Sequence, residues 1–321
     1  MRKQLRLTVL ALLVILIFSV PSYGWFGLGH MAVAYVAYQR LTPQKKDRVD
    51  VLLRMNPDLP NWLALIPPNT SKEDERLMIF MIAATWPDRI KKKSDYPQYT
   101  DDSDVDGGNT PNGKPSNSQN IGYGDLFRHK YWHYKDLPFT QDGTPLHPAP
   151  VPNAETQIDA FRLVLASNQP DSLKSYDLSW LLHIVGDVHQ PLHATSRFGK
   201  TQKKGDAGGN FVKLCSAPCK DELHAFWDGL PGDSDDPVEA IKVAKLLAPA
   251  NQTLAKKLTT AVWINESFAL AKQYVYVTPI GLGAGPFTLT PAYEKKARAI
   301  ANQRVALAGA RLGNLLNKEL K

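Results

Sequence analysis

Cysteine is scarce in this chain: its 321 residues include only Cys215 and Cys219, separated by Ser-Ala-Pro. Two thiols cannot supply the four ligands of a closed, cysteine-rich metal site, so a structural site of that kind is excluded. If the chain reaches an oxidising compartment, the short spacing favours one disulfide that shapes a small loop. A C-x-x-x-C pair of metal ligands is the weaker alternative.

Long apolar runs are also scarce, and the clearest, Leu7–Val20, has only fourteen uncharged residues. A bilayer-spanning helix needs about 20. Three basic residues precede the run, and Ser22-Tyr23-Gly24 after it offers small residues at the two positions that signal peptidases inspect. Residues 1–24 are therefore a predicted signal peptide, cleaved before Trp25, and an uncleaved anchor helix is the alternative. We expect a mature chain exported to the periplasm or the medium, without a permanent membrane anchor.

The mature chain carries little excess charge. Removing residues 1–24 removes three basic residues and no acidic one, so the formal net charge falls from +7 to +4. A mildly basic balance would suit a polyanionic substrate, although an ordinary solvated surface explains it as well.

Strand patterning is weak: no segment alternates convincingly over several strands, and no internal repeat is found. Helical spacing dominates instead, as in Val305, Ala308, Leu312 and Leu315, which lie on one face of the last segment. The fold class expected for residues 25–321 is therefore a mainly α single domain. The predicted helices or helix pairs cover residues 30–41, 42–53, 72–90, 153–166, 172–193, 237–271 and 291–319.

Two polar segments interrupt the helices. Residues 91–128 are rich in Asp, Ser, Asn, Gly and Pro, which predicts a long surface loop or a locally disordered insertion. Asp102-x-Asp104-x-Asp106 resembles the start of a calcium loop, but Gly113 stands where the twelfth position requires Glu, so a solvated acidic loop is favoured. The second segment, 195–222, has basic residues that suit either phosphate contact or solubility: Arg197, Lys200, Lys203 and Lys204.

Candidate metal-binding residues are concentrated between residues 180 and 228. His183 and Asp187 are four apart on a predicted helix and therefore share one face. His224 and Asp228 repeat this spacing, and His193 lies between the two pairs. A single buried His–Asp pair is usually structural, but two pairs and an intervening histidine favour a metal site.

Further candidate ligands lie upstream, each near a large aromatic residue. They are Asp88 in Trp-Pro-Asp, His133 in Trp-His-Tyr, and His30. Imidazole and carboxylate ligands without thiolate favour Zn²⁺ held for hydrolysis. The remaining histidines are expected at the surface or as supports for the ligands: His129, His147 and His189.

These motifs together resemble the zinc-dependent single-strand-specific nucleases, of the same superfamily as zinc phospholipase C. The resemblance implies a helical phospholipase C/nuclease-like fold with a trinuclear zinc cleft. Its motifs run in family order along residues 25–228: Trp25 with His30, Trp-Pro-Asp88, Trp-His133-Tyr, His183-Ile-Val-Gly-Asp187-Val-His-Gln-Pro-Leu-His193, Gly-Gly-Asn210 and Leu-His224-Ala-Phe-Trp-Asp228.

Carried over by position, the resemblance implies three Zn²⁺ ions. The first is expected on Asp88, His133, His183 and Asp187, the second on His193, His224 and Asp228, and the third on His30, the backbone amine and carbonyl of Trp25, and a bridging Asp187. A free amine at Trp25 exists only after cleavage of the signal peptide, so export processing is expected to activate the enzyme.

The implied activity is hydrolysis of single-stranded DNA and RNA, and of 3′-nucleotides, to 5′-phosphate products by a zinc-activated hydroxide. Asp88 and Asp187 are the expected catalytic residues, acting as zinc ligands rather than as general bases. The expected substrate-binding residues are Lys91 near phosphate, Tyr134 stacking on an unpaired base, Asp136 accepting base N–H groups, and Asn210. Core packing is the alternative role for Tyr134.

Two other functions are compatible with these residues. One is a zinc phospholipase C acting on lipid head groups, against which Asp228 argues because those enzymes tend to carry Glu there. The other is an exported binding protein stabilised by zinc, against which the open coordination of the second site argues. The expected partners are single-stranded nucleic acids and nucleotides, with no stable protein partner and a monomeric state.

Overall fold

The computed structural model describes residues 25–102, 120–215 and 221–321. The predicted signal peptide, Asp104 and Asp106 of the acidic motif, and Cys219 lie outside these residues. The predicted disulfide therefore stays a prediction.

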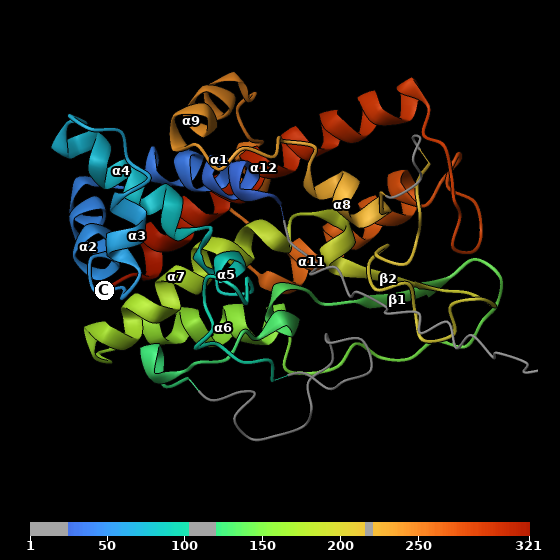
Figure 1. Ribbon diagram of the computed structural model, residues 1–321, viewed down its shortest axis with the longest axis horizontal. Coiled ribbons are helices and arrows are strands. Elements are labelled where there is room, and N and C mark those ends of the chain that lie inside the picture. Colours follow the sequence, from blue (N-terminus) through green and yellow to red (C-terminus); the bar gives the residue numbers. More distant parts are fainter. Residues whose placement is uncertain (1–24, 103–119, 216–220) are drawn as a thin grey trace, which may run out of the picture.

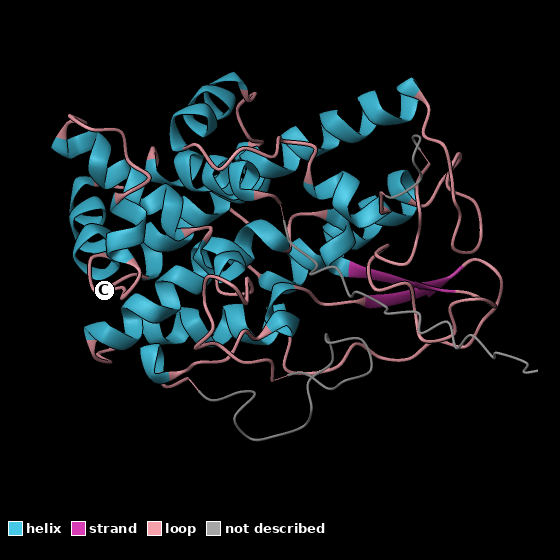
Figure 2. Cartoon of the chain, in the orientation of Figure 1, coloured by secondary structure: helices cyan, strands magenta, loops and turns pink. Residues whose placement is uncertain are grey.

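The described chain is mostly helical, as predicted (Figures 1 and 2). Thr42 caps one helix with its side chain, and Asn153 forms a capping box with Thr156 at the start of another. The longer helices are α1 (Gly27–Tyr38), α2 (Pro43–Leu53), α4 (Lys72–Ala83), α6 (Ala154–Leu165), α7 (Asp171–Asp187), α9 (Pro237–Leu246), α11 (Thr260–Leu270) and α12 (Pro291–Glu319). The shorter ones are α3 (Leu59–Leu63), α5 (Trp86–Arg89), α8 (Leu223–Asp228) and α10 (Gln252–Ala255).

Helix α1 lies in the core and packs against α12, α9, α4 and α7. It crosses α12 closely because Gly309 has no side chain: a Cβ there would lie 2.6 Å from the carbonyl oxygen of Val33. Nine of the twelve residues of α1 are buried, so hydrophobic burial fixes this helix firmly. Since α1 carries His30 and α7 carries His183 and Asp187, their packing brings candidate ligands together.

A small parallel sheet accompanies the helices of this mainly α domain. Strand β1 (Leu137–Thr140) pairs with β2 (Thr195–Phe198), with Leu137 opposite Thr195 (Figure 2). Each strand follows a short 3₁₀ helix that carries a candidate ligand: His133 ends η3 (Lys130–His133), and His193 lies in η4 (Pro191–Ala194). Four-residue strands are too short to show a recognisable alternation, which is why the sequence did not reveal them.

Three predicted helical segments divide in the structure. Residues 72–90 form α4 and α5, and residues 237–271 form α9, α10 and α11. The segment predicted at 172–193 ends as a helix at Asp187, so His193 lies on η4 beyond it. Within the described ranges, none of the helices combines the length and the apolar character needed to cross a bilayer.

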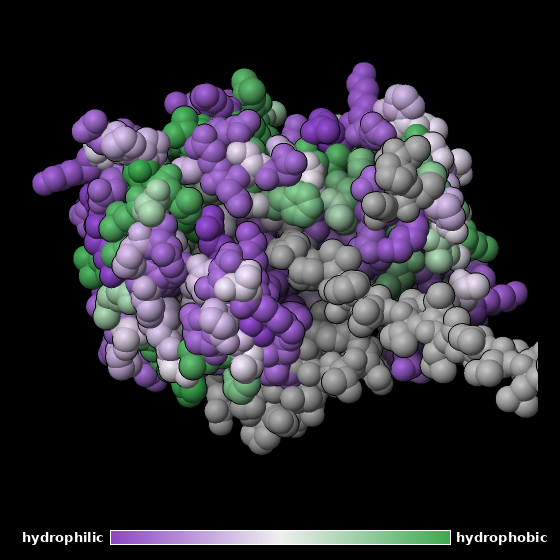
Figure 3. Space-filling view, in the orientation of Figure 1, coloured by the Kyte–Doolittle hydropathy of each residue, from purple (hydrophilic) through white to green (hydrophobic). Residues whose placement is uncertain are grey.

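The polar segment 91–128 is only partly a surface loop. In its described parts, Asp102, Asp125 and Arg128 are buried, and the Arg128 guanidinium donates to the carbonyl oxygen of Ile90. The expectation of a solvated acidic loop is therefore wrong for Asp102, whose carboxylate is bound by neighbouring side chains. Hydrophilic residues cover much of the face in Figure 3, interspersed with small apolar patches.

Candidate metal centre and active site

Asp187 lies at the centre of a buried group of histidines. Its Oδ2 atom is 2.9 Å from Nδ1 of His133 and 3.1 Å from Nε2 of His183. Its Oδ1 atom is 3.3 Å from Nε2 of His30. His183 and Asp187 occupy successive turns of α7, as their spacing predicted, and all four residues are almost completely buried.

Asp88 closes this group from α5. Its Oδ1 atom lies 3.5 Å from Nε2 of His183 and 3.8 Å from Nδ1 of His133. Its Oδ2 atom lies 4.0 Å from Nε2 of His30. Two overlapping triads result, each with the dimensions of a metal site: Asp88–His133–His183 and His30–His183–Asp187.

A third triad lies next to them. Nε2 of His193 is 3.0 Å from Nε2 of His224 and 3.8 Å from Oδ1 of Asp228, and Nε2 of His224 is 3.4 Å from Oδ2 of Asp228. His224 and Asp228 lie one turn apart on α8. The three triads meet because Nδ1 of His193 is 3.9 Å from Oδ1 of Asp187.

Backbone carbonyls orient three of the histidines. Nδ1 of His183 donates to the carbonyl oxygen of Ala84 (2.7 Å), Nδ1 of His193 to that of His133 (2.8 Å), and Nδ1 of His224 to that of Gly208 (2.6 Å). Each bond places the proton on Nδ1 and leaves the Nε2 lone pair facing its triad. Metal-binding histidines are held in this way.

The unsatisfied atoms at the centre fit a bound cation. Nε2 of His30 and Oδ1 of Asp187 are fully buried and have no hydrogen-bond partner in the part of the chain that the structure describes. An unpaired buried polar atom costs about 1–3 kcal/mol, so several in one place indicate a ligand that satisfies them. Nitrogen and oxygen donors without thiolate suit Zn²⁺.

Trp25 and Gly186 shape the space around His30. The Trp25 side chain is fully buried, and its indole N–H donates to the carbonyl oxygen of Gly186 (3.1 Å). A Cβ at Gly186 would lie 2.9 Å from Nδ1 of His30, so glycine is required for the two rings to approach α7. Gly208 has φ +61° and would place a Cβ 2.4 Å from the carbonyl oxygen of Leu192. These supporting glycines lie inside the recognised motifs, but their spacing alone did not reveal their role.

Comparison with known proteins decides the family. The sequence model of the S1/P1 nuclease family matches residues 25–321. The chain belongs to the S1/P1 nuclease family. Endonuclease 5 of Arabidopsis thaliana is 26% identical over 257 residues, which cover 73% of this chain and 75% of that protein. Endonuclease 4 of the same plant is 28% identical over 181 residues, or 49% of this chain and 56% of that protein. The family is zinc-dependent in general, and its members are nucleases.

Lys91 lies against the metal centre rather than in open solvent. Its side chain is buried, and Nζ is 2.7 Å from Oδ1 of Asp88. Burial opposes ionisation of Asp88, but Lys91 and His183 outweigh it and hold the pKa of that carboxyl well below its usual range. Burial, with Lys91 next, lowers the pKa of His133 to about 3. Both effects keep the ligand atoms unprotonated.

The other predicted substrate-binding residues are less closely tied to the triads. Tyr134 and Asp136 are partly buried and connect His133 to β1. Burial and the neighbouring Asp206 raise the pKa of Asp136 well above its ordinary value. The Asn210 side chain donates to the carbonyl oxygen of Ala207 (2.6 Å), beside the Gly208 that supports His224.

Two of the remaining histidines are buried, which excludes a surface position for them and leaves the supporting role open. His129 lies between Asp102 and Asp125, with Nδ1–Oδ2 and Nε2–Oδ2 distances of 2.5 and 2.7 Å. His189 is fully buried, and its Nε2 lies 2.9 Å from a guanidinium nitrogen of Arg311. His147 is exposed, as expected.

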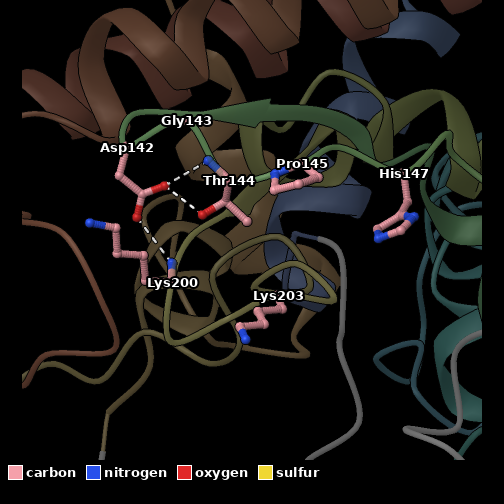
Figure 4. Close-up of a pocket in the computed structure, with 7 residues that line it drawn as sticks. All are labelled: Asp142, Gly143, Thr144, Pro145, His147, Lys200 and Lys203. Carbon is pink, nitrogen blue, oxygen red and sulfur yellow. Dashed lines mark hydrogen bonds between the residues drawn. The ribbon is translucent and has the colours of Figure 1, made fainter.

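The basic residues of β2 and of the loop after it differ in their exposure. Arg197 is buried and donates to the carbonyl oxygens of Gly281 and Gly283, so it ties β2 to the loop before α12. Lys200 and Lys203 are exposed and line a cavity of about 470 Å³ with Asp142 and His147 (Figure 4). The Asp142 carboxylate shapes this cavity by accepting hydrogen bonds from Thr144 and from the Lys200 backbone.

Proposed function

We propose that this protein is a three-zinc endonuclease that hydrolyses single-stranded DNA and RNA, and 3′-nucleotides, to 5′-phosphate products. The observation that carries the proposal is the meeting of three buried His/Asp triads around Asp187 in a chain of the S1/P1 nuclease family. Buried imidazoles and carboxylates that lack partners are typical of a metal centre rather than of a structural core.

The proposed ligands follow the triads. When bound, the zinc ions would supply a water of lowered pKa and would neutralise charge on the phosphoryl and leaving oxygens. The ligand set comprises Asp88, His133, His183 and Asp187 for one ion, His193, His224 and Asp228 for a second, and His30, the Trp25 backbone and Asp187 for a third.

The protein's own residues prepare the site. The Ala84, His133 and Gly208 carbonyls orient three imidazoles toward the triads, as supports of metal ligands do. Lys91 keeps Asp88 ionised. Tyr134 is proposed to stack on an unpaired base, with Asp136 accepting its N–H groups and Asn210 contacting the substrate. A base must leave its stack to reach them, so single strands are favoured.

Removal of the signal peptide during export would complete the proposed zinc centre. We place signal cleavage before Trp25, because the family match begins there and Trp25 is buried beside His30. Cleavage at this point creates the free amine that the third zinc requires. A protein carrying extra residues before Trp25 should bind less zinc, and full zinc content and activity in that protein would contradict this step.

The proposal is tested with protein that begins at Trp25, zinc-loaded or zinc-stripped. The substrates are single-stranded DNA, single-stranded RNA, a 3′-nucleotide, duplex DNA and a choline phospholipid, and the ends formed are identified. We expect zinc-dependent cleavage of single strands that leaves 5′-phosphates. Release of the lipid head group alone would assign a phospholipase, and no turnover by fully loaded protein would assign a binding role.

A further inference from the structure

A second cavity, of about 240 Å³, opens directly beside Asp88. One wall comes from α5 and the residues after it, with Arg89 and Lys92. Another wall comes from the loop between α8 and α9, with Asp233 and Asp235. The cavity thus contacts the metal centre through a proposed zinc ligand and presents charges of both signs.

The two cations are available to a ligand. Arg89 is partly buried, and its Nε donates to Oγ1 of Thr85 (2.9 Å), which fixes the base of the guanidinium. Lys92 is exposed. Within residues 25–102, 120–215 and 221–321, neither side chain has a carboxylate within ion-pair distance. Lys91 between them differs, because it is buried against Asp88.

The two carboxylates line the same cavity as these cations. Asp233 and Asp235 are exposed, and the described residues include no ion-pair partner for either. Asp235 reaches the start of α1 because Gly27 has no side chain: a Cβ there would lie 2.2 Å from Oδ1 of Asp235. Two cations and two carboxylates therefore share one cavity without neutralising each other directly.

From this arrangement we propose that the cavity binds the nucleotide adjacent to the scissile phosphate. Arg89 and Lys92 bind that nucleotide's phosphate, and Asp233 and Asp235 accept N–H groups of its base. This inference rests on the proposed function and deepens it, because it assigns a second nucleotide subsite apart from Tyr134 and Asp136.

The mixed charges select this ligand class. A free phosphate would be attracted by the two cations but repelled by the two carboxylates. A simple cation would be attracted by the carboxylates but repelled by Arg89 and Lys92. A nucleotide carries an anionic phosphate and neutral N–H donors several bonds apart, so it can satisfy both walls. The volume of about 240 Å³ lies below the range of about 300–1,000 Å³ typical of drug-sized ligands, so the cavity has no room for more than one nucleotide unit.

The cation wall is tested by the salt dependence of binding. The probe is a fluorescent oligodeoxycytidylate hexamer with phosphorodithioate linkages, which resist hydrolysis, bound to the zinc-loaded enzyme. Each phosphate contact to a single strand contributes about 0.7 to the slope of log K against log salt. Because Arg89 and Lys92 share one phosphate, we expect Arg89→Ala with Lys92→Ala to reduce the slope by about 0.7, whereas R89K with K92R keeps it.

A matched control removes two exposed cations that do not line the cavity, Lys256 and Lys318. K256A with K318A should leave the slope within error of the wild-type value. An unchanged slope in the Arg89/Lys92 alanine variant, or an equal fall in the control, would overturn the phosphate assignment.

The role of Asp233 and Asp235 is tested by removing their negative charges. If Asp233 and Asp235 accept base N–H groups, D233A with D235A weakens binding of the cytidylate probe although negative charge is removed. The same variant should not weaken binding of an abasic hexamer. Tighter binding of both probes would show that the carboxylates only repel the strand and would overturn their proposed role.

The two proposals fail in different ways. A wild-type enzyme that neither cleaves single strands nor binds the hexamer contradicts the proposed function itself. A wild-type enzyme that cleaves and binds, combined with unchanged slopes and base preference in the variants, contradicts only the subsite.

Discussion

Two buried groups of histidine and aspartate in this molecule use the same residue types to different ends. His129 has both ring nitrogens bonded to carboxylates and stacks on Trp132 with ring centroids 3.6 Å apart. His30 stacks on His183 at a similar distance, 3.7 Å, but neither of its ring nitrogens has a hydrogen-bond partner among the described residues. The comparison shows that unsatisfied ligand atoms, rather than residue type or burial, distinguish a metal centre from a structural ion pair.

The largest expected effect comes from removing the central carboxylate. Asp187→Asn should lower the rate of single-strand cleavage by about 10³-fold or more, the scale on which active sites lose a main electrostatic stabiliser. Bound zinc should fall in parallel, because Asp187 contacts three of the histidines. Cleavage kinetics and elemental analysis of the same samples measure both, and normal zinc content with normal activity would remove Asp187 from the centre.

A smaller effect is expected from crowding the support of His30. Gly186→Ala places a methyl group 2.9 Å from Nδ1 of His30 and should shift that ring. Changes in the support of metal ligands typically cost about 10–100-fold in affinity or activity. Zinc titration followed by cleavage assays checks this, with Gly124→Ala as the control because no atom lies within 4 Å of its added Cβ. Equal behaviour of the two variants would mean that His30 is not held as described.

Removing His129, which is bonded to both Asp102 and Asp125, should affect stability rather than catalysis. His129→Ala leaves Asp102 and Asp125 buried without their shared partner, which should lower the free energy of unfolding by about 3–5 kcal/mol. Zinc content and activity per folded molecule should stay within about twofold of wild type. Urea unfolding and elemental analysis measure the two properties, with His147→Ala as the exposed control. A loss of zinc from the folded H129A protein would erase the distinction between the groups.

The smallest effect concerns pH. Burial lowers the pKa of His129, but Asp102 and Asp125 outweigh it and raise that pKa above the ordinary value of 6.5. The stability contributed by the protonated ring is therefore complete below about pH 6.5 and declines as pH rises through the folded-state pKa. The stability difference between wild type and H129A should shrink over this alkaline range in urea unfolding at stepped pH. A difference that grows with pH would show that His129 is buried uncharged.

The sequence predicted the helical frame and the ligand motifs because both depend on local spacing. The four-residue intervals in His183–Asp187 and His224–Asp228 predict shared helix faces, and the structure has both. Other features depend on contacts between distant segments, which spacing cannot reveal. Thus His129 meets Asp102 across 27 residues and His189 meets Arg311 across 122, so the sequence could not decide between a surface and a supporting position for either histidine.

The candidate metal centre could be predicted from the sequence only in part. The order of the motifs along the chain identified its candidate ligands. The distances around Asp187 and the carbonyl that supports His183 follow only from the packing of α1, α5 and α7. Gly186 was visible in the motif, yet its requirement follows from the position of His30 on another helix.

The most direct test of the account is a zinc titration of stripped protein that begins at Trp25, with single-strand cleavage and bound zinc measured at every step. We expect no cleavage without zinc, and activity that rises to a plateau at three bound ions per chain with 5′-phosphate products. Full activity in zinc-free protein, or no cleavage of single strands by protein that holds three ions, would contradict it.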